Sequence, residues 1–155
     1  MSGILVDSNV LLDVLTEDAR WFAWSADALA RAANEAVLVI NPIVYAEVSV
    51  RFARIEELDE ALPPALHRVQ LPWEAAFLAG KSFVQYRRRG GRKQAPLPDF
   101  YIGAHAAVSG YRLLTRDASR YRTYFPKIEL ISPSEHGAQS PPENKESPRW
   151  TYPPR

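Results

Sequence analysis

The 155-residue sequence has the length of one ordinary domain, and 46% of its residues are hydrophobic, so a core can form. Its formal net charge of +1 indicates no nucleic-acid partner by itself, and the absence of cysteine excludes disulfides and thiolate zinc sites. The apolar runs fall well short of the ~20 residues that a membrane span needs, and no basic leader is present, so we expect a cytoplasmic protein.

Short apolar runs alternate with helical patterns along most of the chain. The predicted strands are 3–6, 37–40, 68–71, 112–115 and 128–131. The predicted helices are 8–15, 21–34, a helix that starts at Pro42 and runs toward Arg54, 56–62, 73–88 and 98–109. Strands that alternate with helices indicate βαβ units, so we predict an α/β fold with a mainly parallel sheet covered on both faces.

The last stretch of the sequence differs from the rest. It holds six of the 13 prolines and almost no residue to bury before Trp150 and Tyr152. We therefore predict a domain at 1–132 and a mostly disordered tail at 133–155. The two aromatic residues could be a contact point for a partner or could stay free.

Four acidic residues stand where a parallel α/β sheet places its ligand site, beyond the carboxyl ends of the strands. Asp7 ends the first strand, and Asp117 follows the strand at 112–115. Asp99 begins the helix at 98–109, and Glu47 lies in an apolar part of the helix after the second strand. We expect the four side chains to converge.

Carboxylates crowded in this way repel one another, and a divalent cation removes that penalty. Mg²⁺ prefers oxygen ligands, and one or two carboxylates commonly hold it together with water and substrate phosphates. Two such ions about 4 Å apart can activate a water and stabilise the leaving oxygen of a phosphodiester. Asn9 and Thr115 each stand two residues from an acid and could orient ligands or waters.

Each acid also has an ordinary structural alternative. Asp7 and Asp99 could be helix caps, Asp117 could be an Asx-turn residue, and Glu47 could pair with an arginine. Because all four acids occur at the expected positions of the strand–helix pattern, the functional interpretation is favoured over four separate structural roles. His105 lies six residues after Asp99, about 240° around the helix, so we expect it to be packed rather than to join the acids.

A basic cluster surrounds Gly90-Gly91 and leads into the loop before Asp99. Its members are Arg87, Arg88, Arg89, Arg92 and Lys93. Phosphate contacts there would give an affinity that depends on salt rather than on sequence. The alternative is a solvated helix end, which basic residues and glycine both suit.

Trp21, Phe22 and Trp24 crowd the start of the second helix. Three aromatic residues within four positions of a helix cannot all face one core. A helix of a partner protein or a second subunit could cover at least one of them, or the domain's own helices could cover all three.

Four segments in order resemble the PIN domain, and within it the VapC-type toxins of bacterial toxin–antitoxin pairs. They are LVDSNVLLD, PIVYAEV, LPDFYIGAHA and LLTRDASRY, and the resemblance spans about residues 3–131. It implies a three-layer α/β/α sandwich and Mg²⁺- or Mn²⁺-dependent endoribonuclease activity. It also implies a cognate antitoxin as inhibitor, and homodimers or larger toxin–antitoxin complexes.

The same resemblance implies roles for individual residues. Asp7, Glu47, Asp99 and Asp117 are implied to bind the metal and to act in catalysis, with the first three around the first ion. Asn9 and Thr115 are implied to support them.

Other functions compete with this one. A catalytically inactive PIN-like module that binds RNA or protein would be expected to lack an acid, and none of the four is missing. A phosphatase would need a second aspartate where Asn9 stands, and a receiver domain would need a better-placed lysine than Lys127. A nuclease of this fold directed at DNA stays open, because the acids do not distinguish the two sugars.

Overall fold

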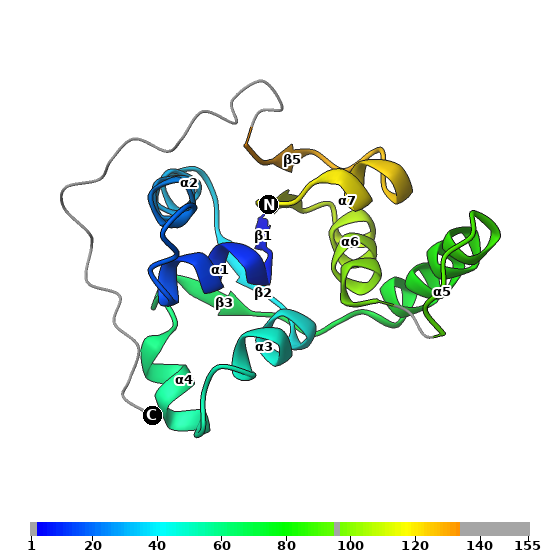
Figure 1. Ribbon diagram of the computed structural model, residues 1–155. Coiled ribbons are helices and arrows are strands. Elements are labelled where there is room, and N and C mark those ends of the chain that lie inside the picture. Colours follow the sequence, from blue (N-terminus) through cyan, green and yellow to red (C-terminus); the bar gives the residue numbers. More distant parts are fainter. Residues whose placement is uncertain (1–2, 95–96, 134–155) are drawn as a thin grey trace.

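Five parallel strands form one sheet in the order β3-β2-β1-β4-β5 (Figure 1). The structure is a computed structural model that describes residues 3–94 and 97–133. The strands are β1 Ile4–Val6, β2 Leu38–Ile40, β3 Leu66–Arg68, β4 Arg112–Leu114 and β5 Leu130–Ile131. All four pairings are parallel, which confirms the predicted parallel α/β sheet.

Helices cover both faces of this sheet. They are α1 Ser8–Leu15, α2 Phe22–Glu35, α3 Pro42–Ser49, α4 Ile55–Ala61, α5 Trp73–Arg88, α6 Pro98–Ser109 and α7 Ser119–Tyr124. Helices α1 and α2 lie on one side of the strands and α6 and α7 on the other, with α5 packed against α6 (Figure 1). Over the described ranges, every helix is too short or too polar to cross a membrane.

The central strand explains why the core forms here. Ile4, Leu5 and Val6 are fully buried, because parallel strands covered on both faces meet apolar side chains on either side. The next residue, Asp7, is therefore carried to the carboxyl edge of the sheet. Asn41 likewise follows β2 and lies at the carboxyl edge of the sheet. Its side chain accepts a hydrogen bond from the Val44 N–H and caps α3 as predicted.

Most predicted elements are confirmed, and three helices agree in every residue: 8–15, 73–88 and 98–109. The helix predicted to run from Pro42 toward Arg54 ends at Ser49 instead. The Ser49 hydroxyl bonds the Ala46 carbonyl oxygen at 2.6 Å, and the Phe52 N–H turns back to the Ser49 carbonyl. Serine side chains that bond the backbone compete with the helical hydrogen-bond ladder, which explains the early end.

The third strand was predicted at 68–71 and lies at 66–68. Its position follows from pairing with β2, where His67 lies opposite Val39 and Arg68 opposite Ile40. Apolar spacing in so short a run does not define the register, whereas the neighbouring strand does.

Helix α7 was not predicted at all. It has only six residues, too few for a helical period to stand out, and Tyr121 is its buried residue. The predicted tail from residue 133, with Trp150 and Tyr152, lies beyond the described residues apart from its first position.

Substitution of Gly103 by alanine is expected to destabilise the fold, because a Cβ on α6 would lie 2.4 Å from the buried Phe125 ring. Such overpacking costs about 1–3 kcal/mol. Gly80→Ala on α5 is the matched control, since its Cβ would meet nothing within 4 Å, and helix propensity favours alanine by up to about 1 kcal/mol. Urea unfolding measures both free energies, and a Gly103→Ala variant as stable as Gly80→Ala would contradict tight packing of α6 on Phe125.

Candidate active site

The Asp7 carboxylate, 3% exposed at the end of the central strand, is held by hydrogen bonds from several elements. Its Oδ1 atom accepts from the Ser8 N–H at 2.7 Å and so caps α1. Its Oδ2 atom accepts from the Tyr121 hydroxyl at 2.8 Å and from the Thr115 hydroxyl at 2.9 Å. Asp7 is thus both a helix cap and the point where β1, β4 and α7 meet.

Two hydroxyl groups link Asp7 to other acids. The Ser8 Oγ atom donates to Glu47 Oε1 at 3.0 Å and lies 3.4 Å from Asp7 Oδ1. The Tyr121 hydroxyl, which donates to Asp7, also lies 3.4 Å from Asp99 Oδ1. Three of the four predicted acids therefore belong to one connected set.

The ordinary alternatives for Glu47 and Asp99 do not hold. Glu47 bonds Ser8 rather than an arginine. Leu97 is the N-cap residue of α6, so Asp99 lies inside the first turn and caps nothing. Its Oδ2 atom instead accepts a hydrogen bond from Arg120 Nη1 at 3.1 Å.

Asp117 stands at the exposed side of this set. Its backbone N–H donates to the Thr115 hydroxyl at 3.2 Å, and its Oδ1 accepts from the Ser119 hydroxyl at 3.2 Å. These local bonds are those of a polar turn. Thr115 connects the Asp117 backbone to Asp7, and the charge of Asp117 also contributes to raising the pKa of Asp99.

Asn9 and Thr115 lie beside Asp7. The Asn9 Nδ2 atom donates to the Thr115 hydroxyl at 3.2 Å and lies 3.5 Å from Asp7 Oδ2. The Asn9 Oδ1 atom accepts the Arg116 N–H at 3.1 Å. The α1 side chain therefore ties the end of β4 to the end of β1.

The acids make one another harder to ionise. Burial is the main cause that raises the pKa of Asp7 from 3.8 to about 6, and the charge of Asp99 adds to it. Burial likewise raises the pKa of Glu47, with added repulsion from Asp7 and Asp99. Burial also raises the pKa of Asp99, although Arg120 opposes the shift. Like charges gathered in a half-buried site are an arrangement that a cation would relieve.

The donor chemistry of this site fits a hard cation, but its geometry is not a closed cage. In residues 3–94 and 97–133, no three side chains of histidine, cysteine, aspartate or glutamate are grouped so that they could hold a metal ion. Serine and tyrosine hydroxyls stand between the carboxylates instead. An all-oxygen set of this kind suits Mg²⁺ held by one or two carboxylates with several waters kept, and the metal-ligand roles stay a prediction.

The basic cluster is exposed throughout, but two of its members have structural contacts. The Arg87 Nη1 atom donates to the carbonyl oxygens of Gly91 and Lys93, so this side chain closes the turn after α5. The Arg89 guanidinium lies 5.4 Å from the centre of the Tyr124 ring. Arg88, Arg92 and Lys93 are exposed, and their contact with phosphates stays a prediction.

The domain itself covers two of the three crowded aromatic residues. Phe22 is buried, and the partly buried Trp24 packs against the core. Trp21 forms an edge contact with Trp24, and the Arg116 guanidinium lies 5.4 Å from its ring centre. His105 is packed as expected, because it is buried and its Nδ1 atom lies 3.0 Å from Asn41 Nδ2.

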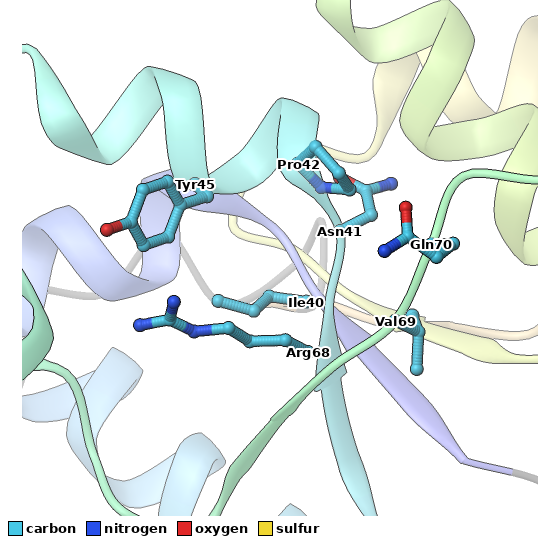
Figure 2. A pocket seen from close by; sticks show the side chains of 7 residues that line it. All are labelled: Ile40, Asn41, Pro42, Tyr45, Arg68, Val69 and Gln70. Atoms are coloured by element: carbon cyan, nitrogen blue, oxygen red, sulfur yellow. The ribbon is translucent and has the colours of Figure 1, made fainter.

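A cavity of about 220 Å³ opens beside α3, at the ends of β2 and β3 (Figure 2). It is lined by Ile40, Asn41, Pro42, Tyr45, Arg68, Val69 and Gln70. Several of its polar groups already have partners, since both Arg68 and the Tyr45 hydroxyl bond Asp59. None of the four acids lines this cavity.

Sequence reasoning missed three residues of the site: Ser8, Arg120 and Tyr121. Ser8 follows Asp7 directly, and a small hydroxyl residue after a strand-end acid is the one local signal that could have indicated a bridge. Arg120 and Tyr121 belong to the unpredicted helix α7, so no pattern pointed to them.

Removal of the Asp7 charge is expected to change how stability depends on pH. Because its pKa is higher in the folded protein, protonation of Asp7 favours the folded state, fully below about pH 4 and no longer above about pH 6. A rise from 3.8 to about 6 corresponds to about 3 kcal/mol. In chelator, the unfolding free energy of wild type minus that of Asp7→Asn should therefore fall by about this amount between pH 4 and 7.5. Chemical denaturation at several pH values measures it, and a flat or rising difference would contradict the burial of this charge.

Comparison with known proteins identifies the family. The PIN domain model matches residues 4–126. A chain of VapBC2 from Rickettsia felis, which was solved bound to a DNA fragment from the VapBC2 promoter, is similar in structure with a TM-score of 0.65. The two chains are 16% identical, and the match covers 83% of this chain and 97% of the Rickettsia chain. A chain of DNA-bound VapBC from Salmonella typhimurium is 17% identical, with a TM-score of 0.64 over 85% and 98%.

A toxin–antitoxin complex from Klebsiella pneumoniae also contains a similar chain, 19% identical, with a TM-score of 0.58 over 86% of this chain and 99% of its own. No curated protein sequence matches. At these identities the structural likeness concerns the fold, while the family model covers most of the domain. The chain belongs to the PIN domain family.

Proposed function

We propose that this protein is a metal-dependent endoribonuclease of the VapC type, the toxin of a toxin–antitoxin pair. One observation carries the proposal: Asp7, Glu47 and Asp99 come from three separate elements and are joined by the hydroxyls of Ser8 and Tyr121. One buried and two half-buried acids with raised pKa values that gather at one edge of a parallel sheet are typical of a reaction site.

The acids would hold Mg²⁺ or Mn²⁺ against the phosphodiester of the RNA. A bound cation of this kind polarises the phosphoryl oxygens and makes a water more acidic. Asp7 is fixed by four protein donors, so its carboxylate needs little rearrangement to bind. Glu47, Asp99 and the exposed Asp117 would complete the ligand set, directly or through water.

A cognate antitoxin is the partner that the comparisons support. Similar chains occur in VapBC complexes and in a complex described as toxin–antitoxin. An antitoxin would inhibit this protein by covering the acids or the basic cluster, and the toxin would assemble as a homodimer or within a larger complex.

RNA would approach over the end of α5, where Arg88, Arg92 and Lys93 are exposed. Contacts there with phosphates need no particular base, so the cluster would supply affinity and the acids would supply chemistry.

Purified protein is expected to cleave structured RNA only with Mg²⁺ or Mn²⁺ and to stop when a chelator is added. Loss of a residue that only supports a metal ligand lowers activity roughly 10- to 100-fold. Asp7→Asn should lower the cleavage rate by more than this, because Asp7 would itself be a ligand. Asp27→Asn is the matched control, since Asp27 is exposed on α2 and pairs with Arg31. Gel analysis of labelled RNA measures the rates.

Each outcome of this experiment separates the candidate functions. RNA that is bound but never cut, by wild type or variant, would replace the nuclease with an inactive binding module. Cleavage of DNA in preference to RNA would change the substrate class. Cleavage that survives in Asp7→Asn would remove Asp7 from the mechanism.

Loss of basic side chains is expected to weaken RNA binding in a salt-dependent way. In the double variant Arg88→Ala, Arg92→Ala, the negative slope of log K against log salt concentration should become less steep by about 0.7 for each arginine on single-stranded RNA. Arg31→Ala, an exposed arginine on α2, should leave the slope unchanged. Fluorescence anisotropy with inactive Asp7→Asn as background measures it, and equal slopes in all three proteins would exclude the cluster as the RNA surface.

A further inference from the structure

Tyr121 is placed to act on the acids although it belongs to no acidic motif. It is the buried residue of α7 and is 1% exposed. Its hydroxyl donates to Asp7 Oδ2 at 2.8 Å and lies 3.4 Å from Asp99 Oδ1. One phenol therefore connects an acid at the end of β1 with an acid in the first turn of α6.

The two carboxylate oxygens of Asp7 differ in how many hydrogen bonds they accept from the protein. Oδ2 accepts from Tyr121 and Thr115 and has Asn9 Nδ2 at 3.5 Å. A carboxylate oxygen has about two lone-pair sites, so Oδ2 is filled by protein donors. Oδ1 has one close donor, the Ser8 N–H.

The Oδ1 atom lies on the side of Asp7 that faces Glu47. Ser8 Oγ lies 3.4 Å from Asp7 Oδ1 and donates to Glu47 Oε1 at 3.0 Å, so Oδ1 lies on the Glu47 side of the carboxylate. A partial rotation of the carboxylate about its Cβ–Cγ bond would break the bonds that Tyr121 and Thr115 donate to Oδ2. These two bonds therefore hold the plane of the carboxylate in one orientation.

We infer that Tyr121 is a positioning residue, which holds the Asp7 carboxylate so that Oδ1 faces a cation shared with Glu47. This inference rests on the proposed function, because it requires a divalent cation at the acids. It assigns a task to α7, the helix that the sequence did not reveal.

Tyr121→Phe tests the inference, because it removes the hydroxyl and keeps the buried ring. The Mn²⁺ dissociation constant, measured by electron paramagnetic resonance at fixed pH without RNA, is expected to rise by roughly 10- to 100-fold, as for the loss of other outer partners of metal sites. Tyr124→Phe is the matched control on the same helix. The Tyr124 ring packs against Phe100 and Tyr86, and no hydrogen bond joins it to the acids in the described part of the chain.

Two further measurements separate positioning from a merely structural role. Melting in chelator reports whether Tyr121→Phe is folded. In an Asp7→Asn background, Tyr121→Phe should cause no further loss of Mn²⁺ affinity, because a residue that acts through Asp7 has nothing left to position. This cycle on two variants keeps the test informative even where the single variant is less stable.

The possible failures are distinguishable. Wild type without Mn²⁺ binding would overturn the metal-dependent function and the inference together. Wild type that binds Mn²⁺ and cleaves RNA, with Tyr121→Phe binding as tightly as Tyr124→Phe, would overturn the inference alone. A loss of affinity of equal size with and without the Asp7 carboxylate would assign Tyr121 to a structural role and also overturn it.

Discussion

The rest of the site depends on one buried negative charge at the end of the central strand. Asp7 follows three fully buried residues, so its carboxylate arrives where water is scarce. A buried charge is tolerated only when hydrogen-bond donors surround it. The end of β4 supplies Thr115, α7 supplies Tyr121, and α1 supplies Ser8 and Asn9. The hydrogen bonds that the Asp7 carboxylate requires therefore hold these three elements together.

The same donors allow several acids to share a small volume. A hydroxyl stands between Asp7 and Glu47 and another between Asp7 and Asp99, while Arg120 offsets part of the charge of Asp99. Burial and mutual repulsion still raise the pKa values of all three acids. Stability is given up at a place where a cation would recover it, a pattern expected of functional sites.

Local signals were sufficient for much of the fold. Three helices were predicted in every residue because capping residues, prolines and glycines mark their ends clearly, as Gly110 does after α6, where it adopts a positive φ of 71°. The predicted boundaries were less accurate for elements whose limits depend on neighbouring segments. The register of β3 follows β2, and the end of α3 follows a serine bond that spacing does not reveal.

The sequence by itself determined which edge of the sheet carries the acids, because a residue after a buried parallel strand must emerge at its carboxyl end. It also placed Glu47 and Asp99 on helices close to that edge. Only the tertiary structure decided how the acids are joined. The Tyr121–Asp7 bond spans 114 residues and the Ser8–Glu47 bond spans 39, and both depend on how whole helices pack and rotate, which no local pattern encodes.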